Sequence, residues 1–174
     1  GNEVVKVNMI NDRGVHICKS MLAYKLFGNN TTPQNSRIKG DHFVGDYYVR
    51  FETELKKQIA DGVATGLSED DAKKNAPLMK DIQQMLVKWE SGDEEVRKLW
   101  SMMNGWVYEG FNATFKKIGN DFQHIYYESN TYLRGKDVVE NGLSSNTFYK
   151  RSDGSVWIDL SSGKTPLFLI IFLI

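Results

Sequence analysis

Apolar residues recur at helical spacing through most of the chain between residues 15 and 118, and this period predicts a series of amphipathic helices. The first runs from about Val15 to Phe27 and ends at a Gly-Asn-Asn sequence, after which Thr31–Lys39 reads as a loop. Four further helices are expected. One is capped by Asp41, and one starts at Ser68, which has Asp71 as its capping-box partner. The other two begin at Pro77 and after the Ser-Gly-Asp sequence at residues 91–93. Their apolar faces comprise Val44, Tyr47, Tyr48, Phe51, Leu55 and Ile59; then Leu78, Ile82, Met85, Leu86 and Trp89; then Val96, Leu99, Trp100, Met103, Val107, Phe111, Phe115 and Ile118.

Two nearly continuous apolar runs, Glu3–Ile10 and Phe122–Tyr127, are typical of strands buried in a parallel sheet. The second run leads into a helix over Thr131–Asn141, which Ser129 can cap and Gly142 can close. Two β-prone arms at 147–151 and 156–160 flank an Asp-Gly turn and predict a hairpin. The order of elements favours an α/β fold with an insertion that begins near Asn146.

Both predicted parallel strands stop at an acidic residue beside a turn-forming or helix-capping residue. Asp12 follows the first strand in the sequence Asn11-Asp12-Arg13-Gly14, and Glu128 follows the second. Open α/β sheets bind ligands in the crevice beyond the carboxyl ends of their strands. A carboxylate at that place suits a cationic ligand, because a guanidinium can be bound by two parallel charge-assisted hydrogen bonds. Stabilisation of a helix N-terminus is the structural alternative for Glu128.

The composition is that of one globular unit of 174 residues, with 22 basic and 22 acidic residues and no net charge. No basic stripe therefore indicates nucleic-acid binding. The single cysteine, Cys18, excludes an internal disulfide framework and is typical of a reducing compartment, so we expect a cytoplasmic protein. The start of the chain does not resemble a secretory signal.

Several apparent motifs fail on inspection. Residues 162–165 have the Ser-Gly-Lys-Thr ending of a phosphate-binding loop, but Ile158 stands where the first glycine should be. The groups around His16 and around His42 match no zinc pattern, so we predict no metal site. His16 and Cys18 are two residues apart on a helix and point in different directions, which argues against a catalytic pair.

Four blocks of the sequence resemble arginyl-tRNA synthetases, a family of class I aminoacyl-tRNA synthetases, in the same order and spacing. The blocks are Val7–Ser20, Lys39–Val49, Trp89–Trp100, and Tyr126–Ser129 with the nearby Tyr132 and Leu133. The resemblance implies a partial Rossmann-type parallel sheet with several packing helices. It also implies that the complete protein activates L-arginine with ATP and Mg²⁺ and transfers it to tRNA(Arg) in protein biosynthesis.

The same resemblance implies roles for individual residues. A glutamate at the position of Glu128 contacts the guanidinium of the arginine substrate in this family. Asn11, Asp12 and Gly14 match a Gly-Asp-x-Gly-like turn, with Asn11 in place of the first glycine, and this turn is expected to shape the floor of the site. No residue of this chain is expected to be catalytic, and we expect neither membrane association nor an obligate protein partner.

Neither ATP-binding signature of the family, His-x-Gly-His or the Lys-Met-Ser-Lys-Ser-like loop, occurs in this sequence. The family pattern places the first before Gly1 and the second beyond Ile174. We therefore expect no ATP-binding motif and no ligase activity in this chain alone. A non-catalytic arginine- or protein-binding module derived from the synthetase fold is the alternative function, and an unrelated helical structural protein is a third.

The expected organisation is a partial catalytic domain over residues 1–145, the start of an inserted β-hairpin segment over 146–160, and a divergent hydrophobic tail over 161–174. The tail ends in the apolar run 167–174, which is too short to span a bilayer as a helix. It is interpreted as the product of a truncated or frame-shifted reading, with a packed terminal strand as the alternative.

Overall fold

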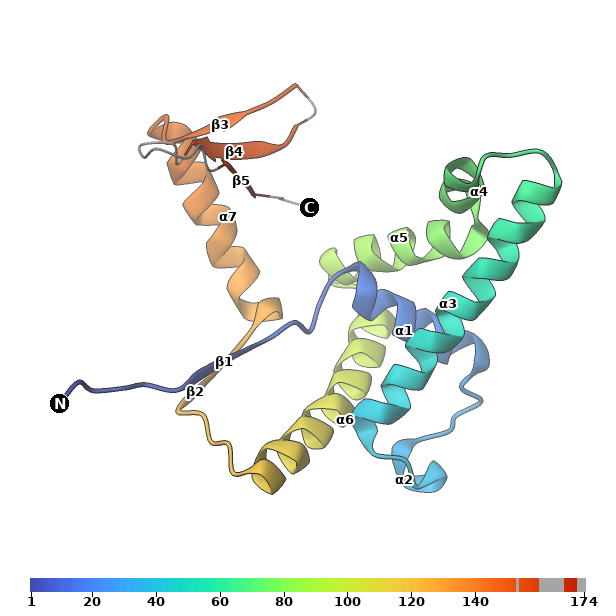
Figure 1. The fold of residues 1–174 in the computed structure, drawn as a ribbon, viewed down its shortest axis with the longest axis horizontal. Helices are drawn as coiled ribbons and strands as arrows, with labels where there is room; N and C mark the ends of the chain where they lie inside the picture. Colours follow the sequence, from blue (N-terminus) through green and yellow to red (C-terminus); the bar gives the residue numbers. More distant parts are fainter. Residues whose placement is uncertain (153, 160–167, 172–174) are drawn as a thin grey trace. The chain divides into compact units, whose positions relative to one another are not determined.

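The computed structural model describes residues 1–152, 154–159 and 168–171 and shows a mixed α/β protein in which helices predominate (Figure 1). The chain divides into two units. A helical unit contains residues 1–6 and 12–123, and a strand unit contains residues 7–11 and the described residues from 124 onward. Of the described helices, none is both long enough and apolar enough to cross a membrane.

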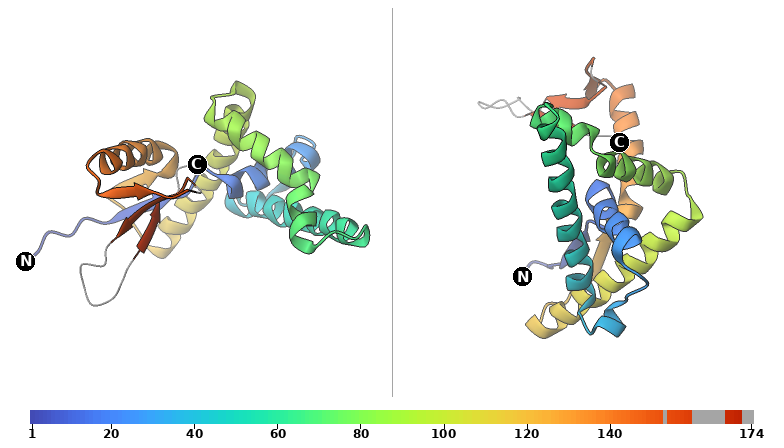
Figure 2. Two further views of the ribbon diagram at one scale, coloured as in Figure 1. Left: turned by 90° about the horizontal axis from the view of Figure 1, so that it is seen from above. Right: turned by 90° about the vertical axis from the view of Figure 1, so that its right-hand side faces the viewer.

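Six helices make up the helical unit. They are α1 (Val15–Phe27), α2 (Pro33–Ser36), α3 (Gly40–Ala64), α4 (Glu69–Asn75), α5 (Pro77–Glu90) and α6 (Glu94–Ile118). Helix α1 packs against α3 and α5, while α3 also packs against α4 and α6. Figures 1 and 2 show α1 lying between α3, α5 and α6.

Local sequence signals set many of these boundaries. The Ser68 hydroxyl accepts a hydrogen bond from the Asp71 amide at 3.1 Å, as the capping sequence predicts. Pro77 opens α5, where its missing N–H has no consequence. The Asp93 carboxylate caps α6 by accepting from the Val96 amide at 3.0 Å, and Gly119 ends that helix with a φ of 74°.

The core of the helical unit contains the predicted face of α5 and part of the predicted faces of α3 and α6, with Phe43 of α3 and Trp106 of α6 as additions. All five apolar residues predicted for α5 are buried. Helix α3 contributes Phe51 and Leu55, which are 0% and 2% exposed. The largest addition is Trp106, which lies outside the predicted stripe of α6 but packs edge-on against Tyr24 and Phe43. At the other end of the predicted stripe, Ile118 is 61% exposed.

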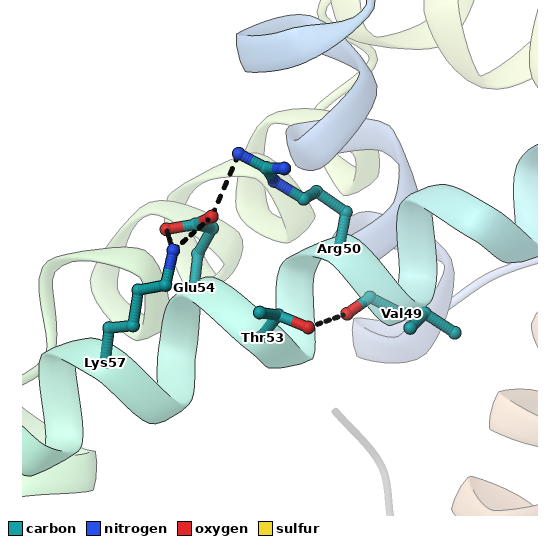
Figure 3. Close-up of polar contacts among 5 residues, drawn as sticks. All are labelled: Val49, Arg50, Thr53, Glu54 and Lys57. Carbon is teal, nitrogen blue, oxygen red and sulfur yellow. Dashed lines mark hydrogen bonds and ion pairs between the residues drawn. The ribbon is translucent and has the colours of Figure 1, made fainter.

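Polar residues line the outer side of α3 (Figure 3). Glu54 accepts from Arg50 one turn earlier and from Lys57 one turn later, each at 3.0 Å. The Thr53 hydroxyl donates to the carbonyl of Val49 at 2.9 Å. Pairs at this spacing each add only a few tenths of a kcal/mol, roughly 0.2–0.5, to a helix.

Two predictions for this unit were wrong in detail. The segment Thr31–Lys39 is not wholly a loop, because Thr32 and Asn35 form a reciprocal capping box that starts the short helix α2. Asp41 does not cap α3. That helix begins at Gly40, and Asp41 lies in its first turn with its carboxylate 2.9 Å from Lys39 Nζ.

The strand unit contains a two-stranded parallel sheet, a helix and a small antiparallel sheet. Its elements are β1 (Val7–Ile10), β2 (His124–Tyr127), α7 (Glu128–Ser144), β3 (Phe148–Lys150), β4 (Val156–Asp159) and β5 (Phe168–Ile171). The prediction that both are strands of one parallel sheet is confirmed, and the structure shows that they pair directly, with Val7 opposite His124 and Ile10 opposite Tyr127. The predicted burial is not confirmed, because Val7 is 52% and Met9 70% exposed.

The predicted hairpin is confirmed as β3 and β4, which pair antiparallel. Helix α7 is longer than predicted. It starts at Glu128 with Tyr127 as its N-cap residue, so Ser129 lies in the first turn and does not cap. Gly142 does not close α7 but lies buried within it, where an added Cβ would come 2.2 Å from the ring of Phe148.

Part of the predicted hydrophobic tail forms a strand. Phe168–Ile171 is β5, which pairs antiparallel with β4 from Asp159 opposite Phe168 to Val156 opposite Ile171. Residues 160–167, which include the Ser-Gly-Lys-Thr sequence at 162–165, and residues 172–174 lie outside the described residues.

Candidate functional site

The carboxyl edge of the parallel sheet carries two of the predicted site residues. Ile10 and Tyr127 are opposite each other as the last residues of β1 and β2. Asn11 and Glu128 directly follow them, so both start from the same edge of the sheet on neighbouring strands. Asn11 is exposed and Glu128 is half-buried.

Glu128 is also the first residue of α7 and the acidic residue of its first turn. A carboxylate at this place is stabilised by the partial positive charge of the helix N-terminus, by about 0.3–1 kcal/mol. This local interaction explains why an acidic residue is tolerated at the end of a strand.

Asp12 and Gly14 belong to the helical unit, and Asp12 is nearly inaccessible, with 1% of its surface exposed. Three side chains of α6 bind it. The indole N–H of Trp100 and the amide N–H of Asn104 donate to the Asp12 carbonyl at 2.6 and 2.9 Å. The Tyr108 hydroxyl donates to the Asp12 carboxylate at 2.7 Å. A residue bound in this way can shape a site but is not accessible to a ligand in solution.

Arg13 is bound to α5. Its guanidinium lies 2.6 Å from a carboxylate oxygen of Glu90 and 5.4 Å from the ring centre of Trp89. Arg97 of α6 stacks on the same indole at 3.5 Å and donates from Nε to the Trp89 carbonyl at 2.7 Å. The side chains of two consecutive residues, Asp12 and Arg13, are therefore attached to two different helices.

Gly14 is the N-cap residue of α1 and has φ 96° and ψ −178°. Residues with a Cβ rarely adopt this conformation, which explains the glycine. Its carbonyl accepts from the amides of Ile17 and Cys18, both at 3.1 Å, and so starts the helix.

The residues that bind Asp12 were not identified from the sequence as site residues. Trp100 was assigned to the apolar face of α6, and Asn104 and Tyr108 were not singled out. One feature of the sequence could have identified them. Asn104 is a polar residue one helical turn after Trp100 and one turn before Tyr108, beside the apolar face predicted for α6. Asn104 is 5% exposed, and a buried amide needs hydrogen-bond partners.

The groups rejected as catalytic or metal-binding have local explanations. Cys18 is buried, and burial, followed by the nearby Glu90 carboxylate, raises the pKa of its thiol to about 11. The thiol is then protonated near neutral pH and is a poor nucleophile. Burial tends to raise the pKa of Asp41, but the hydrogen bond and charge of Lys39, together with the backbone hydrogen bond and charge of His42, outweigh burial and lower it. Within residues 1–152, 154–159 and 168–171, no three His, Cys, Asp or Glu side chains gather in a way that could hold a metal ion.

No protein-family model matches the chain, but named relatives do. It is 55% identical over 162 residues, or 93% of its length, to arginine–tRNA ligases from Bacteroides thetaiotaomicron and Bacteroides fragilis. It is 54% identical over 161 residues to an arginine–tRNA ligase from Parabacteroides distasonis. The chain spans only 27% of the length of each of these relatives. Over almost all of its own length, the chain therefore matches a fragment of arginyl-tRNA synthetase.

Proposed function

We propose that the chain is part of the catalytic domain of an arginine–tRNA ligase, a cytoplasmic enzyme that uses ATP with Mg²⁺ to activate L-arginine and transfers it to tRNA(Arg). The support is the similarity to enzymes of that name over 93% of the chain. The part described here carries neither of the family's ATP-binding signatures. We therefore expect no ligase activity from this chain alone.

The contribution that we propose for this segment is recognition of the arginine side chain by Glu128. The single observation that carries it is the position of Glu128, directly after the last residue of β2 at the carboxyl edge of a parallel sheet. Ligands of open α/β sheets bind beyond that edge. A carboxylate there can accept two parallel hydrogen bonds from a guanidinium, which a lysine ammonium cannot match in geometry.

Asn11, Asp12 and Gly14 are proposed to shape the floor of the same site. For Asn11 the support is its place directly after β1, whose last residue pairs with the residue before Glu128. For Asp12 and Gly14 the support is that they follow Asn11 in the chain and are held in fixed conformations. Because Asp12 is buried and bonded to Tyr108, its proposed role is to set the backbone, without direct contact to the ligand.

We further propose that β1 and β2 are two strands of a larger Rossmann-type sheet. Their parallel pairing supports this, as do the apolar side chains of Val7 and Met9, which are largely exposed on a strand whose composition is typical of burial on both faces. On this view residues 1–145 are a partial Rossmann-type domain, 146–160 are the start of an inserted hairpin segment, and 161–174 are the tail.

Calorimetric titration of the chain with L-arginine tests the role of Glu128. We expect saturable binding that Glu128→Gln weakens about 30-fold or more, because loss of one partner of a hydrogen-bonded charge pair costs roughly 2–5 kcal/mol. Glu140→Gln, which makes the same change on an exposed part of α7, is the matched control and should bind as the unchanged chain does. Citrulline, which has the same shape without the charge, should not bind.

Equal affinity of the chain and of Glu128→Gln would contradict the role of Glu128. The alternative function, a non-catalytic arginine- or protein-binding module, rests on the absence of both ATP-binding signatures from this sequence. The coding DNA separates the two. A His-x-Gly-His sequence upstream in the same reading frame supports the ligase, whereas an independent start with its own control elements supports the module.

A further inference from the structure

Tyr132 lies one helical turn beyond Glu128 on α7. Residues four apart in a helix are neighbours on one face, with their Cβ atoms about 5–6 Å apart. Long side chains of a helix point back toward its N-terminus, so the ring of Tyr132 covers the turn that begins with Glu128. Tyr132 is half-buried, whereas residues 133–138, which follow it, are all exposed. An aromatic ring therefore accompanies the carboxylate at the start of α7.

The ring of Tyr132 has a cation beside it in this structure. The ammonium nitrogen of Lys136, one turn further along α7, lies 5.7 Å from the centre of the ring. A cation over the face of an aromatic ring is attracted by the negative charge of the π system. The position of Lys136 shows that a face of this ring can receive a positively charged group. Glu128, Tyr132 and Lys136 thus form a row of carboxylate, ring and cation along one side of α7.

Gly135 leaves open space on the same side of the helix. It lies three residues after Tyr132 and seven after Glu128, and both spacings belong to one helical face. An added Cβ at this position would meet none of the described residues within 4 Å, so close packing does not account for the glycine. Glycine inside a helix is less favourable than any residue except proline. A ligand that lies against the ring of Tyr132 would require this space.

We propose that Tyr132 is a second substrate-binding residue, whose ring stacks on the guanidinium of L-arginine while the Glu128 carboxylate accepts its N–H groups. This inference rests on the proposed role of Glu128, and all the residues that carry it belong to the strand unit. A guanidinium is planar and weakly hydrated, so it can stack on an aromatic face and donate in its own plane to a carboxylate. When arginine binds, its guanidinium takes the place of the Lys136 ammonium over the ring.

The first test removes the ring or only its hydroxyl group. In calorimetric titrations we expect Tyr132→Leu to weaken L-arginine binding about fivefold or more, because the cation–π contact is lost. Tyr132→Phe retains the ring and should bind within about twofold of the unchanged chain. Tyr149→Leu is the matched control, because Tyr149 is a 40% exposed tyrosine in β3 of the same unit. It should bind arginine as the unchanged chain does.

The second test covers the ring without removing it. Gly135→Leu should weaken arginine binding, because a leucine three residues after Tyr132 packs against its ring. Gly135→Ala is the matched control, since its methyl group is too short to cover the ring, and it should bind as the unchanged chain does. Both substitutions replace a helical glycine with a better helix former. Urea unfolding should therefore show both variants to be at least as stable as the unchanged chain, so weaker binding by Gly135→Leu cannot come from unfolding.

The third test removes the competing cation. Lys136→Gln should strengthen arginine binding about two- to fivefold, because the guanidinium no longer has to displace an ammonium from the ring. Arg134→Gln removes an equal charge from another exposed position of α7 and is the matched control. It should change the affinity less than Lys136→Gln does.

The failures of the two proposals differ. If the unchanged chain binds arginine and Glu128→Gln weakens that binding, but Tyr132→Leu and Gly135→Leu bind at full affinity, Tyr132 does not contact the ligand and the further inference is overturned. Equal losses in Tyr132→Phe and Tyr132→Leu would also overturn it, as would equal changes in Lys136→Gln and Arg134→Gln. If the folded, unchanged chain does not bind arginine at all, the proposed role of Glu128 fails first, and the further inference fails with it.

Discussion

Apolar side chains are buried to different extents in the helical unit and in the strand unit. In the helical unit several large side chains are almost completely enclosed, with Phe51 and Ile82 at 0% and Trp89 at 2% exposure. In the strand unit Met9 is 70% and Tyr126 44% exposed, although both belong to strands whose sequences are typical of a sheet interior. The two units therefore differ in how far their own residues complete a core.

The difference follows from the geometry of the two kinds of element. An amphipathic helix has one apolar stripe, and four such helices can cover one another's stripes. A parallel strand has two faces, and a two-stranded sheet covers neither by itself. The helical unit is thus expected to account for most of the stability of the chain, while the strand unit presents the edge that carries the candidate arginine site.

The largest effect is expected from removing a side chain in the helical core. Phe51→Ala should lower the free energy of unfolding by about 3–5 kcal/mol, because it removes buried apolar surface and leaves a cavity. Met9→Ala in β1 should change it by less than about 0.5 kcal/mol, since most of Met9 is already exposed. Urea unfolding followed by circular dichroism measures both. Equal losses of unfolding free energy in the two variants would show that Met9 of β1 contributes as much to the core as Phe51 of α3.

An intermediate effect is expected where a glycine allows close packing. An added Cβ at Gly110 would lie 2.4 Å from Asp41 Oδ1 between two helices, so Gly110→Ala should cost about 1–3 kcal/mol. Gly142→Ala in the strand unit should cost less, because the half-exposed Phe148 ring in its way can move. Both can be measured by urea unfolding.

Gly105→Ala and Gly135→Ala are the controls for this pair, since an added Cβ at either meets nothing within 4 Å. Each should stabilise its helix by roughly 0.5–1 kcal/mol. A larger cost at Gly142 than at Gly110 would reverse the comparison between the two units.

The smallest effect is expected from the ion pair at the start of α3. Lys39 binds both Asp41 and Thr114 of α6, and it lowers the pKa of Asp41. A carboxylate whose pKa is lower in the folded state contributes stability above its unfolded value of about 3.9, and this contribution is lost as the pH falls from there through the lower folded-state pKa. Asp41→Asn should therefore cost about 1 kcal/mol at pH 7 and progressively less as the pH falls below about 3.9. A cost that is independent of pH in urea titrations would exclude the ion pair as its cause.

The sequence predicted much of the local structure correctly. Helix α1 has the predicted bounds, α5 begins at the predicted Pro77, and the hairpin is formed by the predicted arms. These features depend on caps, turn residues and periodicity within a few residues of each position. The same holds for Glu128, whose place between a strand and a helix can be read from the neighbouring residues.

Only the tertiary structure decided which residues meet over long distances in the chain. The residues that bind Asp12 lie 88 to 96 positions away from it, and Trp106 is buried by aromatic rings of α1 and α3. The exposure of β1 and β2 likewise depends on which elements pack against them. An apolar strand sequence favours burial, but burial requires other elements that cover the strand. Local sequence patterns therefore determined the helices and strands of this protein. The burial of Trp106 and the hydrogen bonds to Asp12 depend instead on the packing of α6 against segments that are distant in the sequence.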